Sequence, residues 1–203
     1  MSKIFIFAFF LSFNLWAATT KGDPLPDNAR LQDIFEAIKD VPISYDPDGA
    51  VCEQVARIEL EREYPSELYD VAVGIEYKLK GPTLGELDMI VFDKRTNNVV
   101  LVSEVKCWKS FKGGLEKAME QRGRFTWVLQ NNPQTLIMTS HEGRTVSSSQ
   151  FVGNNNYKTI SQLGGVKYGF DQELPYTLRE LKRLRSMLLR CKVWTGCAER
   201  VGD

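Results

Sequence analysis

Two carboxylates and a lysine near the middle of the chain have the types and spacing of a metal-assisted hydrolytic site. Asp88 lies in one apolar segment, Glu104 lies in the next, and Lys106 follows two positions later. Carboxylate oxygens favour Mg²⁺ or Mn²⁺. A metal ion held by carboxylates and a substrate phosphate readies water for in-line attack, and a nearby lysine neutralises charge that grows on the phosphate. These residues therefore predict cleavage of phosphodiester bonds.

A β-hairpin is expected to bring the two carboxylates together. Strand-like segments at 87–93 and 99–107 flank a turn-prone stretch, and the hairpin they form sets Asp88 opposite Glu104. The two-residue period of a strand predicts that Lys106 shares their face, together with four apolar residues, Ile90, Phe92, Val100 and Val102. Burying such charges is costly unless a cation is bound. The alternative is an exposed salt bridge on an ordinary hairpin.

Helical and strand periodicities surround this hairpin. Apolar spacing predicts a short helix over 31–38 and a second helix from about Asp48 to Tyr64, and a strand over 71–79 follows. Helical spacing resumes from Leu115 until Asn131, and residues 136–139 have the composition of one more strand. The expected fold is α/β, with the order helix, three strands, helix, strand in a mixed sheet flanked by helices.

The first 17 residues have the layout of a secretory signal peptide. Lys3 precedes an apolar run from Ile4 to Trp16, and two alanines follow. The run holds 13 residues, fewer than the roughly 20 that a membrane-spanning helix needs. We therefore expect residues 1–17 to be removed and 18–203 to form a single exported domain with no membrane partner. The alternatives are an uncleaved membrane-surface anchor and a buried core helix.

Secretion or export to a periplasm permits disulfide bonds. The four cysteines, Cys52, Cys107, Cys191 and Cys197, allow three fully paired connectivities, and pairing of the last two is the local option. Free or buried thiols are the alternative, and the spacing does not suggest zinc.

Charge is balanced over the whole chain but not locally. With 26 basic and 26 acidic residues the formal net charge is +0, so no global basic field indicates a nucleic-acid partner. A helix predicted from about Pro175 concentrates basic residues, namely Arg179, Lys182, Arg183, Arg185, Arg190 and Lys192. It is a phosphate-binding face, a solvated face whose leucines pack inward, or both at once. Residues 141–174 are assigned to loops, with room for short strands, and form a candidate flap.

Several enzyme classes lose their usual sequence support. His141 is the only histidine, which excludes a two-histidine ribonuclease mechanism, and it is expected to be a turn residue. The chain has no G-x-S-x-G elbow, Walker phosphate loop, H-E-x-x-H or paired C-x-x-C motif.

The segment Gly85-Glu86-Leu87-Asp88, followed after fifteen residues by Glu104-Val105-Lys106, resembles the motifs of PD-(D/E)XK nucleases. The resemblance covers roughly residues 48–140. It implies a restriction-endonuclease-like core, with Asp88 and Glu104 as metal ligands and Lys106 as the residue that orients water or stabilises the transition state. Leu87 stands where the family has proline, which is not a ligand.

Two further positions are similar to features of this superfamily. Gly49 to Glu53 resembles the helix glutamate of archaeal Holliday-junction resolvases, which implies that Glu53 is a third ligand or a base. Gln121 matches a glutamine on the helix after the lysine, and its alternative is a solvent-facing position. Trp108 is a candidate for stacking on a base, or else a core residue. Nearby basic residues either line a phosphate path or form a solvated face: Lys109, Lys112, Lys117, Arg122 and Arg124.

The expected protein is an exported endo- or exonuclease that depends on Mg²⁺ or Mn²⁺, with nucleic acid as substrate and DNA favoured. Two alternatives remain: a non-catalytic restriction-endonuclease-like secreted protein that binds nucleic acid, and a structure-selective enzyme of the resolvase type.

Overall fold

The computed structural model describes residues 27–47, 49–153, 156–194 and 197, and a seven-stranded mixed sheet lies at its centre. The helices are α1 (Asp27–Ile38), α2 (Ala50–Glu63), α3 (Phe111–Asn131) and α4 (Leu178–Trp194). The strands are β1 (Tyr69–Lys78), β2 (Thr83–Asp93), β3 (Val99–Val105), β4 (Ile137–Ser140), β5 (Thr145–Val146), β6 (Asn156–Ser161) and β7 (Gln172–Glu173). The 3₁₀ helices η1 (Ser148–Gln150) and η2 (Val166–Tyr168) lie in connections. The segment expected to be a signal peptide, residues 1–17, lies outside the described residues.

The sheet is built around an antiparallel meander of β1, β2 and β3, and its strand order is β5-β4-β1-β2-β3-β6-β7. After β3 the chain crosses through α3, and β6 then pairs parallel to β3. The predicted mixed sheet with flanking helices is therefore confirmed, as is the order of helix, three strands, helix and strand.

The strand predicted at 136–139 exists as β4, but it pairs with the outer edge of β1 and forms a hairpin with β5. The strand that follows α3 beside β3 is β6, within the segment assigned mainly to loops. Its polar composition gives no apolar alternation, so its strand conformation depends on hydrogen bonds to other segments of the chain. Lys106 donates its backbone N–H to Ile160, and Asp171 accepts hydrogen bonds from Thr159 N and Oγ1 at 2.8 and 2.9 Å.

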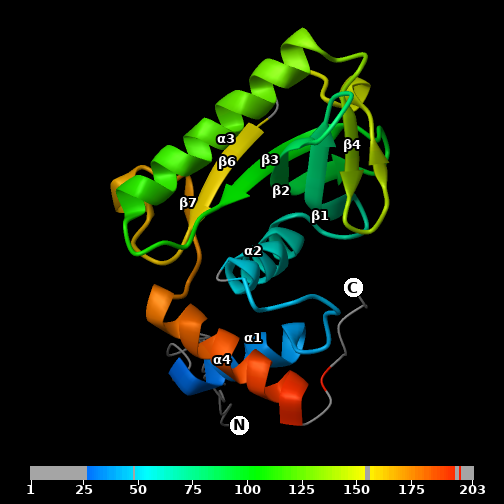
Figure 1. Cartoon of the computed structure of the whole chain (residues 1–203). Helices are drawn as coiled ribbons and strands as arrows, with labels where there is room; N and C mark the ends of the chain where they lie inside the picture. The colour runs from blue at the N-terminus through cyan, green and yellow to red at the C-terminus, as the bar shows by residue number, and fades with distance from the viewer. Residues whose placement is uncertain (1–26, 48, 154–155, 195–196, 198–203) are drawn as a thin grey trace, which may run out of the picture.

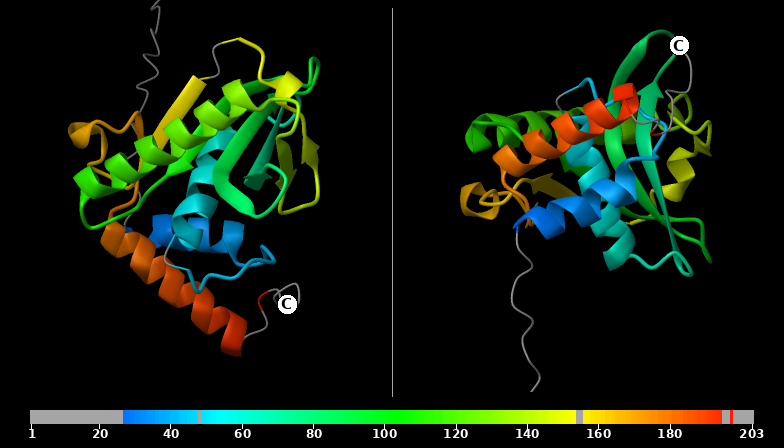
Figure 2. Two further views of the ribbon diagram at one scale, coloured as in Figure 1. Left: turned by 45° about the horizontal axis from the view of Figure 1, so that its top comes forward. Right: turned by 90° about the horizontal axis from the view of Figure 1, so that it is seen from below.

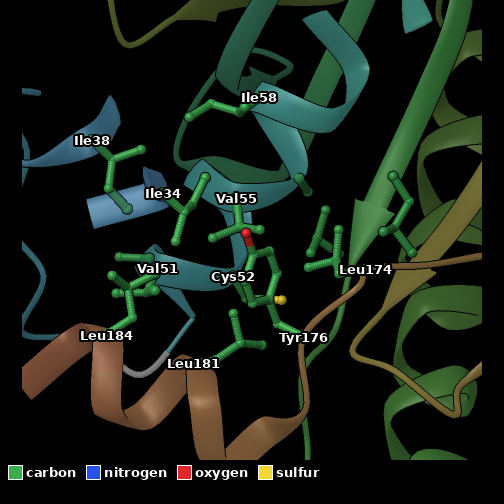
Figure 3. Packing of buried hydrophobic residues seen from close by; sticks show 14 of the residues in the cluster. Ile34, Ile38, Val51, Cys52, Val55, Ile58, Leu174, Tyr176, Leu181 and Leu184 are labelled. Atoms are coloured by element: carbon green, nitrogen blue, oxygen red, sulfur yellow. The ribbon is translucent and has the colours of Figure 1, made fainter. Parts of the chain in front are cut away.

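Helices cover both faces of the sheet (Figures 1 and 2). α3 lies on one face, where its residues Phe125 and Val128 pack on Ile90, Phe92 and other strand residues. On the other face α2 packs against the sheet, and α1 and α4 pack on α2. Buried residues from α1, α2, α4 and this face of the sheet form one continuous cluster around α2 (Figure 3).

Val100 lies on the opposite face of the sheet from the one predicted for it. The β2–β3 register shifts between Val91 and Phe92, where Phe92 pairs with Val99. This irregularity places Val100 against the α2 cluster, whereas Val102 remains in the α3 cluster. The strict two-residue alternation from Asp88 to Lys106 was therefore wrong at this position, because an extra residue in one strand reverses the faces beyond it.

α4 confirms the inward packing of its leucines, since Leu181, Leu184 and Leu188 are all buried. The four cysteines form two disulfides, Cys52–Cys107 and the local pair Cys191–Cys197, so the free-thiol alternative is wrong. In the described part of the chain, no helix has both the length and the apolar character needed to cross a bilayer.

Candidate active site

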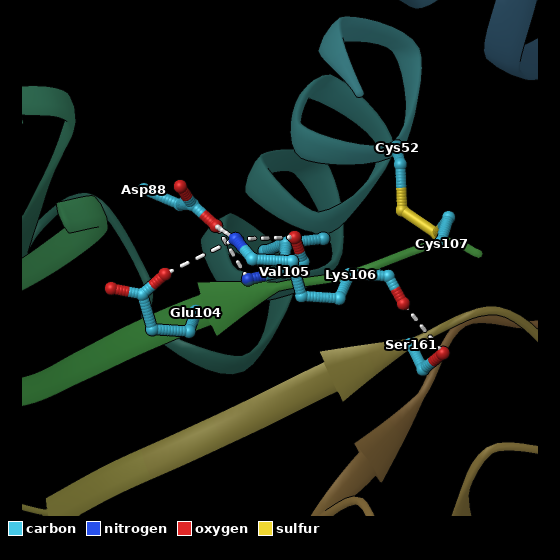
Figure 4. A network of polar contacts seen from close by, with 7 residues as sticks. All are labelled: Cys52, Asp88, Glu104, Val105, Lys106, Cys107 and Ser161. Atoms are coloured by element: carbon cyan, nitrogen blue, oxygen red, sulfur yellow. Dashed lines mark hydrogen bonds and ion pairs between the residues drawn. A yellow bond between two sulfur atoms is a disulfide. The ribbon is translucent and has the colours of Figure 1, made fainter. Parts of the chain in front are cut away.

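Asp88, Glu104 and Lys106 meet at the end of the β2–β3 hairpin (Figure 4). The Lys106 ammonium donates to Oδ2 of Asp88 at 3.1 Å and to Oε2 of Glu104 at 3.2 Å. The side chain of Lys106 is only 12% exposed, so the predicted alternative of a surface salt bridge is wrong. The three predicted residues therefore form a buried cluster of two acids and one base.

The hairpin register explains why these side chains meet. Met89 pairs with Ser103, so Asp88 and Glu104 occupy the next opposed positions, as the turn predicted. The regular ladder stops there. Oδ2 of Asp88 instead accepts the backbone N–H of Val105 at 2.6 Å. On the other side of Asp88 lies Gly74, because the β1–β2 register passes from Val73–Met89 to Ile75–Leu87.

Glu104 is fully buried, and its electrostatics reflect that position. Burial raises the pKa of Glu104 to about 8, the Asp88 carboxylate adds to the increase, and Lys106 opposes it. Burial by itself would lower the pKa of Lys106, but the two neighbouring carboxylates raise it overall. Oε1 of Glu104 is buried without a hydrogen-bond partner. An unsatisfied buried carboxylate oxygen is costly, so this atom is a strong acceptor for a cation or a donor.

Glu53 lies in the first turn of α2 and interacts electrostatically with the cluster. Burial raises the pKa of Glu53 to about 7, with further contributions from the Asp88 and Glu86 carboxylates, while Lys106 opposes the shift. These interactions place Glu53 within electrostatic range of the hairpin residues. The helix is also tied covalently to the segment just after β3, because Cys52 precedes Glu53 and its disulfide partner Cys107 follows Lys106 (Figure 4).

Gln121 lies on the sheet-facing side of α3. It follows the buried residue Ala118 by three positions and precedes the buried Phe125 by four, so it shares their stripe. Its Oε1 is buried and has no hydrogen-bond partner, as is also the case for one oxygen of Glu104. The solvent-facing alternative is therefore wrong for this side chain.

Glu86 and His141, which were not predicted as site residues, line a cavity beside the site. The cavity has a volume of about 670 Å³, and its walls include Glu53, Glu86, His141 and Gly74. Nε2 of His141 lies 3.5 Å from Oε1 of Glu86. Burial raises the pKa of the Glu86 carboxyl, and His141 opposes this shift. His141 is a turn residue as predicted, but its side chain belongs to this cavity.

Gly74 explains how the imidazole fits there. Its φ is +58°, and a Cβ atom at this position would lie 2.2 Å from Nδ1 of His141. His141 also donates its backbone N–H to the carbonyl of Gly74 at 3.0 Å. A sequence signal was present in Glu86, two residues before Asp88, but His141 comes from a distant turn and has no local signal.

The basic residues after β3 were predicted to line a phosphate path or to form a solvated face, and they differ in which description fits. Lys117 and Arg124 both pair with Glu120 on the exposed side of α3, as in a solvated helix face. Lys112 lies 3.9 Å from Glu116. The guanidinium of Arg122 lies over the Tyr157 ring. Lys109 and Trp108 line a separate cavity beside α4, and Trp108 is 47% exposed, so the core reading for this tryptophan is wrong.

The donor set suits a hard divalent cation. Asp88 and Glu104 supply carboxylate oxygens on adjacent strands, and one Glu104 oxygen has no hydrogen-bond partner. Within the described residues, however, no group of three or more His, Cys, Asp and Glu side chains is arranged to hold a metal ion. Lys106 bridges the two acids, and Glu53 approaches from another element. The residues thus fit a site with two protein carboxylates, in which substrate and water supply the remaining ligands.

No protein-family model matches the chain, and no characterised protein or solved structure is significantly similar to it.

Proposed function

We propose that the protein is an exported nuclease that uses Mg²⁺ or Mn²⁺ to hydrolyse phosphodiester bonds, with DNA favoured over RNA. The observation that carries the proposal is the buried cluster of Asp88, Glu104 and Lys106, in which one oxygen of Glu104 has no hydrogen-bond partner. Buried acids at this spacing are costly to stability, and perturbed buried acids are enriched at functional sites.

Each residue has a role in this chemistry. Asp88 and Glu104 would hold the metal, which when bound supplies Lewis-acid polarisation of the phosphoryl group. Lys106, released from one carboxylate, neutralises charge that grows on the phosphate oxygens. Glu53 takes the proton of the attacking water, since a carboxylate whose pKa is about 7 is matched to proton transfer near neutral pH. The water oxygen bonds to phosphorus as the bond to the leaving oxygen on the opposite side breaks, and the leaving oxygen takes up a proton from solvent.

The fold supports the same proposal at the level of topology. A PD-(D/E)XK nuclease is expected to have a helix, three strands, a helix and a strand. This chain has α2, the β1–β3 meander and α3 in that order, and after the β4–β5 hairpin β6 pairs with β3. In support of the proposal, Glu53 lies on α2, Asp88 and Glu104 lie on β2 and β3, and Gln121 lies on α3. Two disulfides and the apolar segment near residue 4 support export.

A second candidate is a secreted protein that binds nucleic acid without cleaving it. The favouring observation is the double ion pair of Lys106, because a lysine that contacts both acids compensates their charge without a metal. In that case Asp88, Glu104 and Lys106 are a structural cluster, and their replacement affects folding but no reaction.

The deciding experiment is degradation of plasmid DNA and of RNA by the oxidised protein, with Mg²⁺, with EDTA, and with Asp88→Ala and Lys106→Ala variants. Cutting that requires Mg²⁺ and disappears in both variants supports the nuclease. Absence of cutting by well-folded protein with any divalent metal favours the non-catalytic binder. Cutting of four-way junctions but not of linear duplex identifies the resolvase-type alternative.

A further inference from the structure

A second cavity, lined by both cysteines of the Cys52–Cys107 disulfide, lies between the segment after Lys106 and helix α4. Its volume is about 250 Å³. Its apolar walls include Val51, Cys52, Cys107, Trp108 and Leu181. This volume is just below the range of roughly 300 to 1,000 Å³ that drug-sized ligands occupy, so the cavity suits one small planar group.

The charge around the cavity has one sign. Lys109, Lys182 and Arg185 line it, and no acidic residue does. In the described part of the chain, Lys109 and Lys182 take part in no ion pair. Arg185 has a structural role, because its Nε donates to the carbonyl of Tyr45 at 2.8 Å. A ligand that is apolar and planar at its centre and anionic at its edge is complementary to these walls.

The side chain of Trp108 is exposed, and its backbone is held in place. Its backbone carbonyl accepts a hydrogen bond from Nε2 of the buried Gln162 at 2.8 Å, and the preceding Cys107 is disulfide-bonded. One residue earlier, the carbonyl of Lys106 accepts from Oγ of Ser161 at 2.8 Å. The indole is therefore presented to solvent from a fixed backbone, which lowers the entropy lost when an aromatic ligand stacks on it.

The cavity is adjacent in the chain to the candidate active site. Cys52 and Cys107 line it. Lys106, which precedes Cys107, belongs to the buried cluster, and Glu53, which follows Cys52, lies within electrostatic range of that cluster. A polymer that spans this cavity and the candidate active site must carry repeated anionic groups and flat apolar groups.

We propose that this cavity holds one unpaired base of a single-stranded nucleic acid, stacked on Trp108, with neighbouring phosphates beside Lys109 and Lys182. Aromatic side chains and lysines are the usual means by which proteins hold single strands without sequence preference. In a duplex the base faces are already covered by their neighbours, so a base pair has no surface to offer Trp108. This inference rests on the proposed function and makes single strands, or frayed ends, the preferred substrate.

The test is binding of a short fluorescein-labelled thymidine strand, and of the same strand in duplex, measured by anisotropy with the oxidised full chain in EDTA. Trp108→Ala and the more conservative Trp108→Leu remove the stacking surface. Trp127→Ala removes another exposed tryptophan, 60% exposed on α3, and serves as the matched control. Lys109→Ala with Lys182→Ala tests the charges, and Lys78→Ala with Lys80→Ala is the equal-charge control.

The expected result is tighter binding of the single strand than of the duplex. Both Trp108 variants should weaken single-strand binding by about 10-fold, and Trp127→Ala should leave it unchanged. A single-strand affinity insensitive to Trp108→Leu, or a preference for duplex, overturns the inference even if Mg²⁺-dependent cleavage is intact. Conversely, Trp108-dependent binding without any cleavage supports the base site and contradicts the proposed nuclease.

Discussion

The Asp88 carboxylate on β2 and the Lys106 ammonium just after β3 lie 3.1 Å apart, at the point where the ladder between these strands ends. The same Asp88 oxygen also accepts the backbone N–H of Val105. Because Lys106 contacts Glu104 as well, one ammonium bridges two buried carboxyl groups. A divalent cation would compete with Lys106 for the same oxygens, and the stability of the cluster should therefore depend on both.

Replacing Lys106 by methionine tests this competition. Lys106→Met leaves two acids without their partner, and we expect the free energy of unfolding in EDTA to fall by about 3 kcal/mol near pH 8. Mg²⁺ should restore part of this loss, because it supplies the missing positive charge. Thermal melts with EDTA and with Mg²⁺ measure both effects.

The matched control for that variant is Lys117→Met, since Lys117 pairs with Glu120 on the exposed side of α3. A surface pair of this kind contributes about 1 kcal/mol or less, and its loss should not respond to Mg²⁺. Equal losses for the two lysine variants would contradict the buried cluster.

The pH dependence of stability should carry the signature of Glu104. Its pKa is raised from 4.5 to about 8, mainly by burial, so the folded protein holds this proton more tightly than the unfolded chain. The associated stability is present below about pH 4.5 and is lost as the pH rises toward 8. Melts of the metal-free protein at a series of pH values should therefore decline over this window.

Glu104→Gln isolates that contribution, because the amide does not titrate. The decline should be smaller in this variant than in the wild type, and Mg²⁺ should offset the wild-type decline by favouring the ionised carboxyl. A pH profile that is the same in both proteins would mean that Glu104 does not titrate in this range.

The two disulfides provide a pair of matched variants. Cys52 and Cys107 are separated by 55 residues and Cys191 and Cys197 by 6. Loop-closure entropy predicts losses of about 4 kcal/mol and about 2 kcal/mol when each pair is replaced by serines. Only the first replacement should also reduce the proposed nuclease activity, because it frees the helix that carries Glu53 from the segment that follows Lys106. Denaturant melts and initial cleavage rates separate the two effects, and an equal loss of activity in both variants would contradict a specific role for Cys52–Cys107.

Gln121 separates function from stability in a different way. Its Oε1 is buried without a hydrogen-bond partner. Gln121→Leu replaces this unsatisfied acceptor with an apolar side chain of similar size, so the melting temperature should stay the same or rise. If the amide belongs to the site, cleavage should fall by about 10-fold in the same variant, measured under single-turnover conditions. Unchanged cleavage would make Gln121 a packing residue only.

The hairpin at the centre of the site was predictable because its information is local. A turn-prone stretch between two apolar segments fixes the register, and the register fixes Asp88 opposite Glu104. The shift between Val91 and Phe92 has no comparable local signal, and it reversed the face of Val100. The local sequence pattern was thus enough to predict how the two strands pair, but not which face of the sheet each residue occupies.

Features that depend on distant segments were not predictable. β6 consists largely of polar residues and is defined by hydrogen bonds to Lys106 and Asp171. Likewise, His141 reaches Glu86 only because β4 pairs with β1 and Gly74 leaves room for the ring. The sequence allowed three disulfide pairings, and the choice of Cys52–Cys107 requires the position of α2 over the end of β3.

The most direct test of a metal site at Asp88 and Glu104 is a titration with Mn²⁺, with free ion measured by electron paramagnetic resonance. The wild-type protein should bind Mn²⁺ and release it to excess Mg²⁺, and the near-isosteric variants Asp88→Asn and Glu104→Gln should each lose this binding. Asp70→Asn, which changes an acid on the neighbouring strand β1, should retain it. Absence of binding by folded wild-type protein, or equal binding by all four proteins, would contradict a metal site and leave the cluster as a buried ion pair.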